Sequence, residues 1–219
     1  MKAYVIGDIH GCYYTLKNVL NSIQTTLEKE DTIVFLGDYF DRGPHNYKVF
    51  CLLNSLQYEG VKLVFLRGNH EQMMLDALNE RSKEYLWFSN GGEITSEQFL
   101  SKPNIIKPFV KEWIQNLPFA YYNDKLDFYC VHAHLPHTSI DDFNKDEKED
   151  CIWRRAQSIV GKRVFHGHTP HKNFVKVSDN DINLDAGCVF GGGLSYAIVT
   201  KNFYGITIVP TDERDKVNF

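Results

Sequence analysis

The clearest pattern in the chain is a short apolar run that ends in a glycine and polar residues, and it occurs three times. The runs are four to six residues long, begin about thirty residues apart and are typical of buried strands in a parallel sheet. They are Ala3–Ile6, Thr32–Leu36 and Val61–Leu66. The sequences that follow them are Gly7-Asp8-Ile9-His10-Gly11, Gly37-Asp38-Tyr39-Phe40-Asp41-Arg42-Gly43 and Arg67-Gly68-Asn69-His70-Glu71. Because ligands bind beyond the carboxyl ends of such strands, the three loops predict one shared site.

Apolar residues at helical spacing follow each of these loops. The three predicted helices are Tyr13–Leu27, Tyr47–Leu56 and one that opens with Glu71–Leu78. Each strand, loop and helix leads to the next strand, which is the βαβ arrangement of an α/β protein. Since such crossovers are right-handed, we expect the three loops to lie along one edge of the sheet.

The segment from Glu80 to Phe119 has a helical and aromatic pattern, and we expect it to form a small helical cap beside the site. Pro108 should lie near the start of its last helix, where a missing N–H does no harm. The apolar stripe of that helix consists of Ile105, Ile106, Phe109, Val110, Trp113, Ile114 and Leu117.

The second half of the chain changes to short strands separated by Gly, Asn and Asp. The candidates are Asp127–Val131, Arg163–Phe165, Phe174–Val177, Ile182–Leu184, Leu194–Thr200 and Phe203–Val209. Lys201-Asn202 suits a tight turn between the last two. These strands predict a second, more antiparallel sheet packed on the first. The acidic stretch Asp141–Asp150 is expected to be a solvated surface loop.

Composition narrows the class of protein further. A chain of 219 residues with 43% hydrophobic content suits one α/β domain, here residues 1–219. Neither a signal peptide nor a membrane span is recognisable near the start, so we expect a cytoplasmic protein without a membrane partner. Five cysteines without a CxxC pair argue against a disulfide framework and a thiolate metal site. A formal charge of −4 provides no basic face for a nucleic-acid polymer.

Oxygen and nitrogen donors gather in the three loops and at two later histidines. They are Asp8, His10, Asp38, Asn69, His132 and His168. Without thiolate, these donors suit Mn, Fe or Zn at a catalytic site with open positions, and Mn²⁺ is the expected metal. Asp38 on the middle loop is the candidate to bridge two ions. Two ions about 3.5 to 4 Å apart clamp the oxygens of an in-line phosphoryl displacement and generate hydroxide, so we expect hydrolysis of a phosphate ester.

In its motifs the sequence resembles the metallophosphoesterases, and among them the bacterial and bacteriophage serine/threonine branch of the phosphoprotein phosphatase family. The matching stretches are Gly7–Gly11, Gly37–Gly43, Gly68–Glu71, His132-Ala133, Gly167–Thr169 and Asn183–Gly192. The resemblance implies a calcineurin-like fold of two packed mixed β-sheets flanked by helices, with a dinuclear centre. It assigns Asp8, His10 and Asp38 to one ion and Asp38, Asn69, His132 and His168 to the other.

The remaining roles rest on chemical need together with this resemblance. Arg42 on the central loop can grip a phosphate dianion with two parallel hydrogen bonds. A second arginine is expected after Trp153, and the family's W-x-R arrangement selects Arg155 over the adjacent Arg154. His70 would be the general acid, with Asp41 accepting from its other ring nitrogen to hold its orientation.

Three functions stay open at this point. The leading one is a metal-dependent serine/threonine protein phosphatase, acting on phosphorylated proteins or small phosphoesters. A symmetrical dinucleoside tetraphosphate hydrolase has nearly the same motifs, and a non-catalytic phosphate-binding module is disfavoured by the intact set of donors. The roles of His134 and His166, which adjoin predicted ligands, also stay open.

Overall fold

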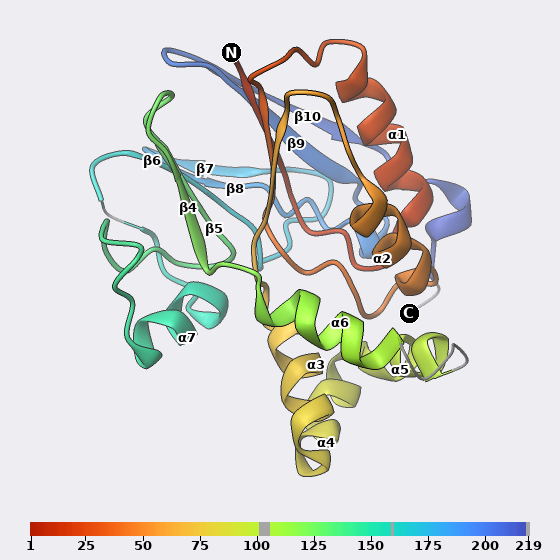
Figure 1. Ribbon diagram of the computed structural model, residues 1–219. Helices are drawn as coiled ribbons and strands as arrows, with labels where there is room; N and C mark the ends of the chain where they lie inside the picture. Colours follow the sequence, from red (N-terminus) through yellow and green to blue (C-terminus); the bar gives the residue numbers. More distant parts are fainter. Residues whose placement is uncertain (101–105, 159, 218–219) are drawn as a thin grey trace.

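Two five-stranded mixed sheets form the centre of the computed structural model, which describes residues 1–100, 106–158 and 160–217 (Figure 1). The first sheet has the strand order β10-β9-β1-β2-β3. Its strands are β1 (Ala3–Ile6), β2 (Thr32–Phe35), β3 (Lys62–Phe65), β9 (Leu194–Val199) and β10 (Tyr204–Val209). The three predicted parallel strands are confirmed, because β1 pairs with β2 and β2 with β3 in parallel.

The second sheet has the order β4-β5-β6-β8-β7. Its strands are β4 (Ala120–Asn123), β5 (Phe128–Val131), β6 (Arg163–His166), β7 (Lys176–Ser178) and β8 (Asp181–Asn183). The expectation of a more antiparallel second sheet is wrong, because each sheet contains two parallel and two antiparallel pairings. Strand β4 was not expected from the sequence.

The β9–β10 hairpin belongs to the first sheet, whereas the sequence analysis placed its two strands in the second sheet. β9 pairs antiparallel with β1, opposite Ala3 to Ile6. A strand's pattern shows which faces are buried but not which neighbour supplies its hydrogen bonds, so a hairpin near the end of the chain can join either sheet. The predicted turn at Lys201-Asn202 does lie between the two strands.

Alternate residues of the central strands face two different cores. Ala3 and Val5 belong to the core between the two sheets, with Phe128, Phe165 and Ile182. Tyr4 and Ile6 belong to the core on the other face, which contains the apolar side of the first helix. Burial on both faces explains why these strands read as continuous apolar runs.

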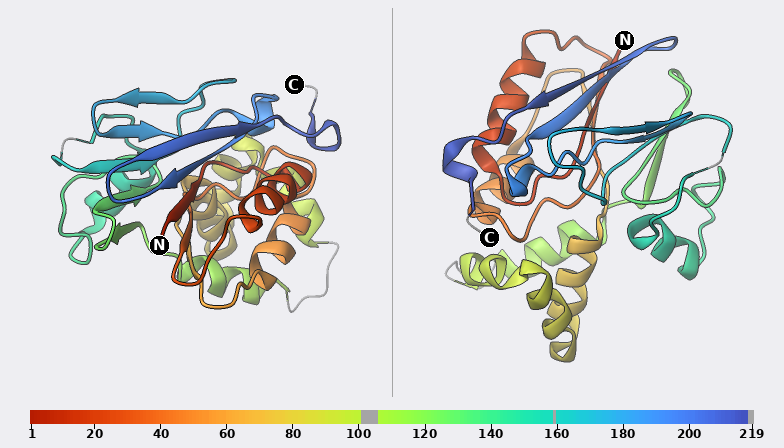
Figure 2. Two further views of the ribbon diagram at one scale, coloured as in Figure 1. Left: turned by 90° about the horizontal axis from the view of Figure 1, so that it is seen from above. Right: turned by 180° about the vertical axis from the view of Figure 1, so that it is seen from behind.

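Helices cover the outer face of the first sheet and one end of the molecule (Figures 1 and 2). They are α1 (Tyr13–Gln24), α2 (Asn46–Ser55), α3 (Asn69–Asn79), α4 (Glu84–Trp87), α5 (Glu93–Leu100), α6 (Ile106–Gln115) and α7 (Lys145–Trp153). Helices α3 to α6 gather below the sheets in Figure 1 and form the expected helical cap. None of the described helices is long and apolar enough to cross a lipid bilayer.

Helix α6 carries the predicted apolar stripe. Pro108 is its third residue, as expected, and Val110 and Ile114 are fully buried. Phe109 departs from the stripe with 44% of its surface exposed, although its ring contacts Phe50 edge-on. Ile105 and the side chain of Ile106 lie outside the described residues.

Helix α7 corrects the predicted acidic loop at 141–150. Asn144 caps it, because its side chain accepts from the backbone N–H groups of Asp146 and Glu147 at 2.9 and 3.1 Å. The Glu147 carboxylate in turn accepts from the Asn144 backbone N–H at 2.8 Å. This reciprocal cap stabilises the start of the helix. Near its C-terminal end the side chains of Cys151 and Ile152 are buried. The sequence did not predict this helix because the segment is rich in charged residues and has few apolar ones.

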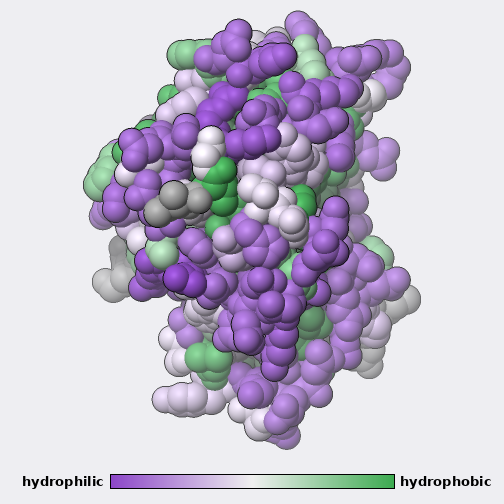
Figure 3. All heavy atoms as spheres, turned by 90° about the vertical axis from the view of Figure 1, so that its left-hand side faces the viewer, coloured by the Kyte–Doolittle hydropathy of each residue, from purple (hydrophilic) through white to green (hydrophobic). Residues whose placement is uncertain are grey.

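The face that includes the second sheet is mainly polar. In Figure 3 hydrophilic side chains predominate there, and hydrophobic ones form small separated patches. Scattered hydrophobic side chains of this kind are normal on protein surfaces.

Candidate active site

The first two loops are joined by their backbones. The N–H groups of Ile9 and His10 donate to the Asp38 carbonyl at 3.1 and 2.9 Å, and Gly11 donates to the Tyr39 carbonyl at 2.9 Å. These bonds hold the loop after β1 against the loop after β2. The side chains of both loops are therefore placed by main-chain contacts that do not depend on side-chain conformation.

Glu71 ties the third loop to the second. Its carboxylate accepts from the N–H groups of Asp38, Tyr39 and Gly68 at 2.8, 2.9 and 3.0 Å. Glu71 is completely buried at the start of α3, so its three bonds are shielded from water. The predicted convergence of three loops thus has a buried carboxylate at its centre.

Backbone strain is concentrated at this point. Five residues of the site that are not glycine have positive φ angles, between 45° and 73°, a region costly for side-chain-bearing residues. They are His10, Asp38, Asp41, Arg42 and His168. Two glycines allow close approach: a Cβ on Gly43 would collide with the His10 carbonyl, and one on Gly167 with the Asp8 carboxylate. Such strain persists where the surroundings hold it in place, as at binding sites.

Two groups of buried ligand-type side chains within the described residues share Asp38. One consists of His10, Asp38 and His70, and the other of Asp38, His132 and His168. The Asp38 Oδ2 atom lies 3.5 Å from His10 Nε2 and 3.4 Å from His132 Nε2. Asp38 is therefore positioned as a bridge between two cation sites.

Asn69 lies between the two histidines of the second group. Its Oδ1 atom is 3.0 Å from both His132 Nε2 and His168 Nδ1. The remaining ring nitrogens contact backbone carbonyls, Leu36 for His132 and Trp153 for His168, at 2.9 and 3.2 Å. Each ring can donate to its carbonyl on that side, so His132 Nε2, His168 Nδ1 and Asn69 Oδ1 converge on one point, as ligand atoms do around a cation.

Asp8 lies beside these groups but outside both. Its Oδ2 accepts from the His168 N–H at 3.0 Å, whereas its buried Oδ1 has no hydrogen-bond partner among the described residues. The geometry groups His70, rather than Asp8, with His10 and Asp38. The predicted assignment of Asp8 to the first ion stays a prediction.

The buried charges of the site fit divalent cations. Burial, and then the neighbouring Asp185 carboxylate, raise the pKa of Asp8 well above its usual range. Burial and the charge of Asp38 raise the pKa of Glu71 to about 7. For Asp38 itself burial acts upward, but His132 and other histidines outweigh it and the pKa is well below its usual range. Crowded buried carboxylates and an unpartnered oxygen call for compensating positive charge, which bound metal ions would provide.

Two ligand-type histidines also have the protonation state that metal binding needs. Burial and the charge of Arg42 lower the pKa of His10 well below its usual range. Burial and the charge of His132 lower the pKa of His168 to about 3. Both rings are neutral near pH 7 and can offer a nitrogen lone pair.

His70 forms the pair with Asp41 that the sequence predicted. Its Nδ1 lies 2.7 Å from Asp41 Oδ2, and both side chains are buried. The cap completes this pair, since Trp87 Nε1 donates to the same oxygen at 2.9 Å and the Thr95 hydroxyl donates to Asp41 Oδ1 at 2.6 Å. Thr95 Oγ1 also accepts from the Asp41 N–H at 3.0 Å. Helices α4 and α5 therefore hold the carboxylate that orients His70.

Arg42 is placed by the same part of the cap. Its N–H donates to the Gly91 carbonyl at 3.0 Å, and a Cβ on Gly91 would meet the Arg42 side chain at 2.8 Å. The guanidinium donates from Nη1 to His10 Nε2 at 2.8 Å. Since that nitrogen is the predicted metal ligand, metal binding at His10 requires Arg42 to release it.

The two candidate arginines after Trp153 have different surroundings. Arg154 forms an ion pair with Asp150, four residues earlier, at 2.9 Å. Both arginines are exposed and line a cavity next to His168, but among the described residues only Arg154 of the two forms an ion pair. The uncommitted guanidinium of Arg155 favours it as the phosphate ligand, which stays a prediction.

His134 and His166 have local partners away from the shared Asp38. The Nδ1 atom of His134 lies 3.2 Å from the Ala156 carbonyl. His166 Nε2 lies 3.2 Å from Asp181 Oδ2, which gives this ring a partner on β8.

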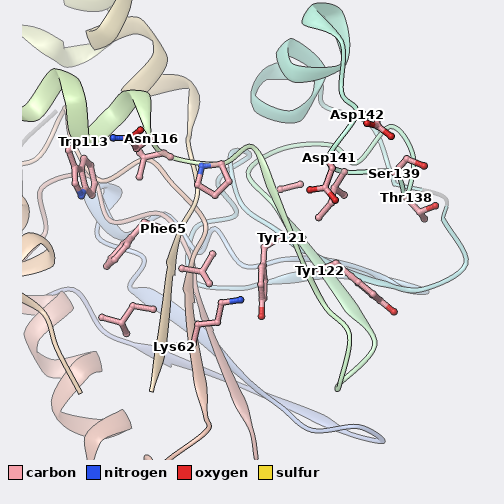
Figure 4. Close-up of a pocket in the computed structure, with 16 residues that line it drawn as sticks. Lys62, Phe65, Trp113, Asn116, Tyr121, Tyr122, Thr138, Ser139, Asp141 and Asp142 are labelled. Carbon is pink, nitrogen blue, oxygen red and sulfur yellow. The ribbon is translucent and has the colours of Figure 1, made fainter. Parts of the chain in front are cut away.

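A wide hollow of about 940 Å³ lies away from this site. It opens between β3, β4 and the 138–142 loop, where Tyr121 and Lys62 face each other across the gap between the sheets (Figure 4). None of the predicted site residues lines it. Its size is therefore no guide to the chemistry.

The fold and the two histidine–aspartate groups define a metal-dependent phosphoesterase. The family model described as calcineurin-like phosphoesterase matches residues 1–203, and the chain belongs to this family.

Similar proteins differ in the substrates that their names state. Serine/threonine-protein phosphatase 1 of Salmonella typhimurium is 30% identical, over 89% of this chain and 90% of its own. The asymmetrical bis(5'-nucleosyl)-tetraphosphatase PrpE of Oceanobacillus iheyensis is 28% identical, over 94% and 92%. The crystal structure of a cold-active protein-tyrosine phosphatase from a psychrophilic Shewanella species has a TM-score of 0.64 at 16% identity, over 96% and 80%. The last likeness concerns the fold alone.

Sequence reasoning missed three residues that organise the site. Glu71 was quoted within a motif without a role, and Trp87 and Thr95 were not singled out. The signal for the last two was the pair Gly91-Gly92 inside a helical segment, which marks a close backbone contact. A Cβ on Gly92 would collide with the Trp87 ring.

The shared position of Asp38 predicts what its neutralisation should do. Asp38→Asn keeps the side-chain shape, and asparagine tolerates the positive φ of 50° at this position. Loss of the bridging charge should abolish activity and release metal from both sites, whereas Asp8→Asn should mainly weaken one. Metal content per chain after dialysis, measured by mass spectrometry, checks this. Two tightly held ions in Asp38→Asn would contradict the bridge.

Thr95→Val should disturb Asp41 without touching His70. Valine preserves the shape but removes the hydroxyl, so turnover of a phosphoserine peptide should fall roughly 5- to 20-fold, a loss similar to one or two hydrogen bonds. Thr25→Val, the same change at an exposed position, is the matched control. If Thr95→Val lowers the melting temperature but leaves turnover unchanged, Thr95 has a structural role only.

Proposed function

We propose that this protein is a phosphomonoesterase that hydrolyses phosphoserine and phosphothreonine in proteins. The observation that carries the proposal is the Asp38 carboxylate shared by two buried histidine groups, with the His70–Asp41 pair beside it. The 30% identity to a serine/threonine-protein phosphatase over nearly the whole chain supports the substrate class. We further propose that Mn²⁺ is the metal, with Fe and Zn as alternatives that the same donors suit.

The proposed ligands are the six side chains identified in the sequence. We assign Asp8, His10 and Asp38 to one ion and Asp38, Asn69, His132 and His168 to the other. When bound, two such ions polarise phosphoryl oxygens and lower the pKa of water. The ring orientations of His132 and His168 support this assignment, because both present a nitrogen toward Asn69.

The other residues act on the phosphate and on the leaving group. Arg42 and Arg155 hold the non-bridging oxygens and stabilise their negative charge in the transition state. His70 gives its Nε2 proton to the departing serine oxygen. Asp41 accepts from Nδ1 and keeps the ring aimed at that oxygen, with Trp87 and Thr95 holding Asp41.

A second candidate function is hydrolysis of dinucleoside tetraphosphates. The similarity to the asymmetrical tetraphosphatase PrpE, which is 28% identical and covered over 92% of its length, supports this candidate. The sequence had suggested the symmetrical type. The two types differ in products, since symmetrical cleavage of diadenosine tetraphosphate yields two ADP and asymmetrical cleavage yields ATP and AMP.

A substrate panel tests the proposal. Turnover of phosphoserine, phosphothreonine and phosphotyrosine peptides and of diadenosine tetraphosphate is measured with manganese, and the nucleotide products are identified. The proposal expects the highest kcat/KM on phosphoserine or phosphothreonine. A higher value on diadenosine tetraphosphate would replace it with the second candidate.

Replacing Arg154 and Arg155 by alanine, one at a time, should show which of them holds the phosphate. If Arg155 holds phosphate, Arg155→Ala should reduce kcat/KM by the equivalent of about 2 to 4 kcal/mol, as for other oriented charge donors. Arg154→Ala should be mild, because its partner is the surface residue Asp150. Steady-state kinetics on one phosphopeptide ranks the two variants. The reverse ranking would shift the phosphate ligand to Arg154.

The role of His70 can be tested through the leaving group. A serine alkoxide must be protonated as it leaves, whereas p-nitrophenolate departs unaided. His70→Asn should therefore lower kcat on a phosphoserine peptide by roughly 10² to 10⁴, with a clearly smaller loss on p-nitrophenyl phosphate and unchanged metal content. Asp41→Asn should show the same asymmetry more weakly. Equal losses of kcat on both substrates would mean that His70 stabilises the phosphoryl oxygens and does not protonate the leaving group. His134 would then be the next candidate for the general acid.

A further inference from the structure

A small cavity adjoins the proposed metal site on the side of the second sheet. Its volume is about 170 Å³, and its walls come from the segment after α7, the loop after β6 and strands β7 and β8. His168 is part of its wall, so the cavity and the metal site share a side chain. A water needs only about 10 to 15 Å³ of such space, so the cavity can hold a hydrated oxyanion.

The lining of this cavity is cationic. It includes Arg154, Arg155 and Lys176 but only one carboxylate, Asp181. That carboxylate is already bonded to His166 at 3.2 Å and to the Ser158 N–H at 3.1 Å. A positive cavity stands out in a chain with a formal charge of −4.

The three cations are not equally available. Arg154 is held by Asp150 outside the cavity. Arg155 and Lys176 form no ion pair within the part of the chain that the structure describes, and both are exposed. Arg155 lines the cavity together with His168. Arg155 is therefore near the metal site, and Lys176, on the edge strand β7, is a free cation of the same cavity.

We propose that this cavity is a subsite for a second phosphoryl group of the same substrate, with Lys176 as its characteristic ligand. The inference rests on the proposed function, because the first phosphoryl group lies at the metal site. Arg155 lies between the two positions, and Lys176 binds the distal group. The shared chemistry is a second phosphate, supplied by a polyphosphate chain or by a neighbouring phosphorylated residue.

Inhibition by inorganic anions tests the subsite. Inorganic phosphate and tripolyphosphate are compared as inhibitors of p-nitrophenyl phosphate hydrolysis by the metal-loaded protein. Lys176→Ala should raise the inhibition constant for tripolyphosphate roughly three- to fivefold, as expected for one exposed ionic contact, and Lys176→Glu roughly tenfold or more. The constant for inorganic phosphate should change less than about twofold, because phosphate alone reaches only the metal site.

Lys201→Glu is the matched control, since Lys201 is exposed at the β9–β10 turn and outside the cavity lining. Lys201→Glu changes the net charge by the same amount as Lys176→Glu. Removal of metal by tripolyphosphate would affect the wild type and both variants alike. A normal response to Lys201→Glu with a selective loss in Lys176→Glu supports the subsite. Equal losses in the two variants, equal changes for both anions, or no change in Lys176→Glu would overturn it.

Failure of the subsite differs from failure of the proposed function. If the wild-type protein turns over no phosphoester, the proposed function fails. Calorimetric titration of the metal-loaded proteins still tests the subsite, because Lys176→Glu should weaken the binding of tripolyphosphate more than the binding of inorganic phosphate.

If the enzyme is active, the KM of Lys176→Glu on two kinds of substrate identifies the source of the second phosphate. A KM increase on diadenosine tetraphosphate indicates that the second phosphate belongs to a polyphosphate chain. A KM increase on a doubly phosphorylated peptide, without one on the singly phosphorylated peptide, indicates that it belongs to a neighbouring phosphorylated residue. No KM increase on either substrate would count against the subsite.

Discussion

The interactions of Asp38 are the constraint on which the rest of the site depends. Its carbonyl binds the loop after β1, its N–H donates to Glu71, and its Oδ1 accepts from the His70 N–H at 3.1 Å. Its Oδ2 faces histidines from both groups. One residue thus joins three strand ends and contributes its carboxylate to both groups of ligand-type side chains. The parallel register of β1, β2 and β3 brings these ends together.

The helical cap is part of the chemistry through Asp41. Trp87 and Thr95 satisfy the carboxylate from outside the sheet, so His70 is oriented by residues of α4 and α5. An aromatic cluster attaches this cap to the loop, with Phe40 in contact with Phe99 and Trp113. A change in cap packing would therefore reach the proposed general acid through one buried carboxylate. Buried polar networks of this kind are sensitive because every member needs its partners.

The fold does not specify the substrate. Proteins similar to this chain in sequence or in fold carry names that state serine/threonine-protein, protein-tyrosine or dinucleoside tetraphosphate substrates. Function therefore resides in the residues at the rim of the site. In this chain the rim includes Arg155 and Lys176 beside His168, and it is there that a second phosphate would distinguish one substrate class from another.

The pairing of His70 with Asp41 was expected from chemical need together with the family resemblance. The sequence by itself determined the three parallel strands, their loops and the helical cap, because strand burial and helical periodicity are local patterns. It also indicated each of the six proposed ligands. Tertiary structure alone decided that β9 and β10 join the first sheet, because hydrogen-bond partners are chosen by packing over long sequence separations. It alone revealed that Glu71 clamps two loops and that Trp87 and Thr95 hold Asp41, since these bonds join residues 32 to 54 positions apart. Helix α7 was missed for a local reason, because a capping box and a short buried end outweighed its charged composition.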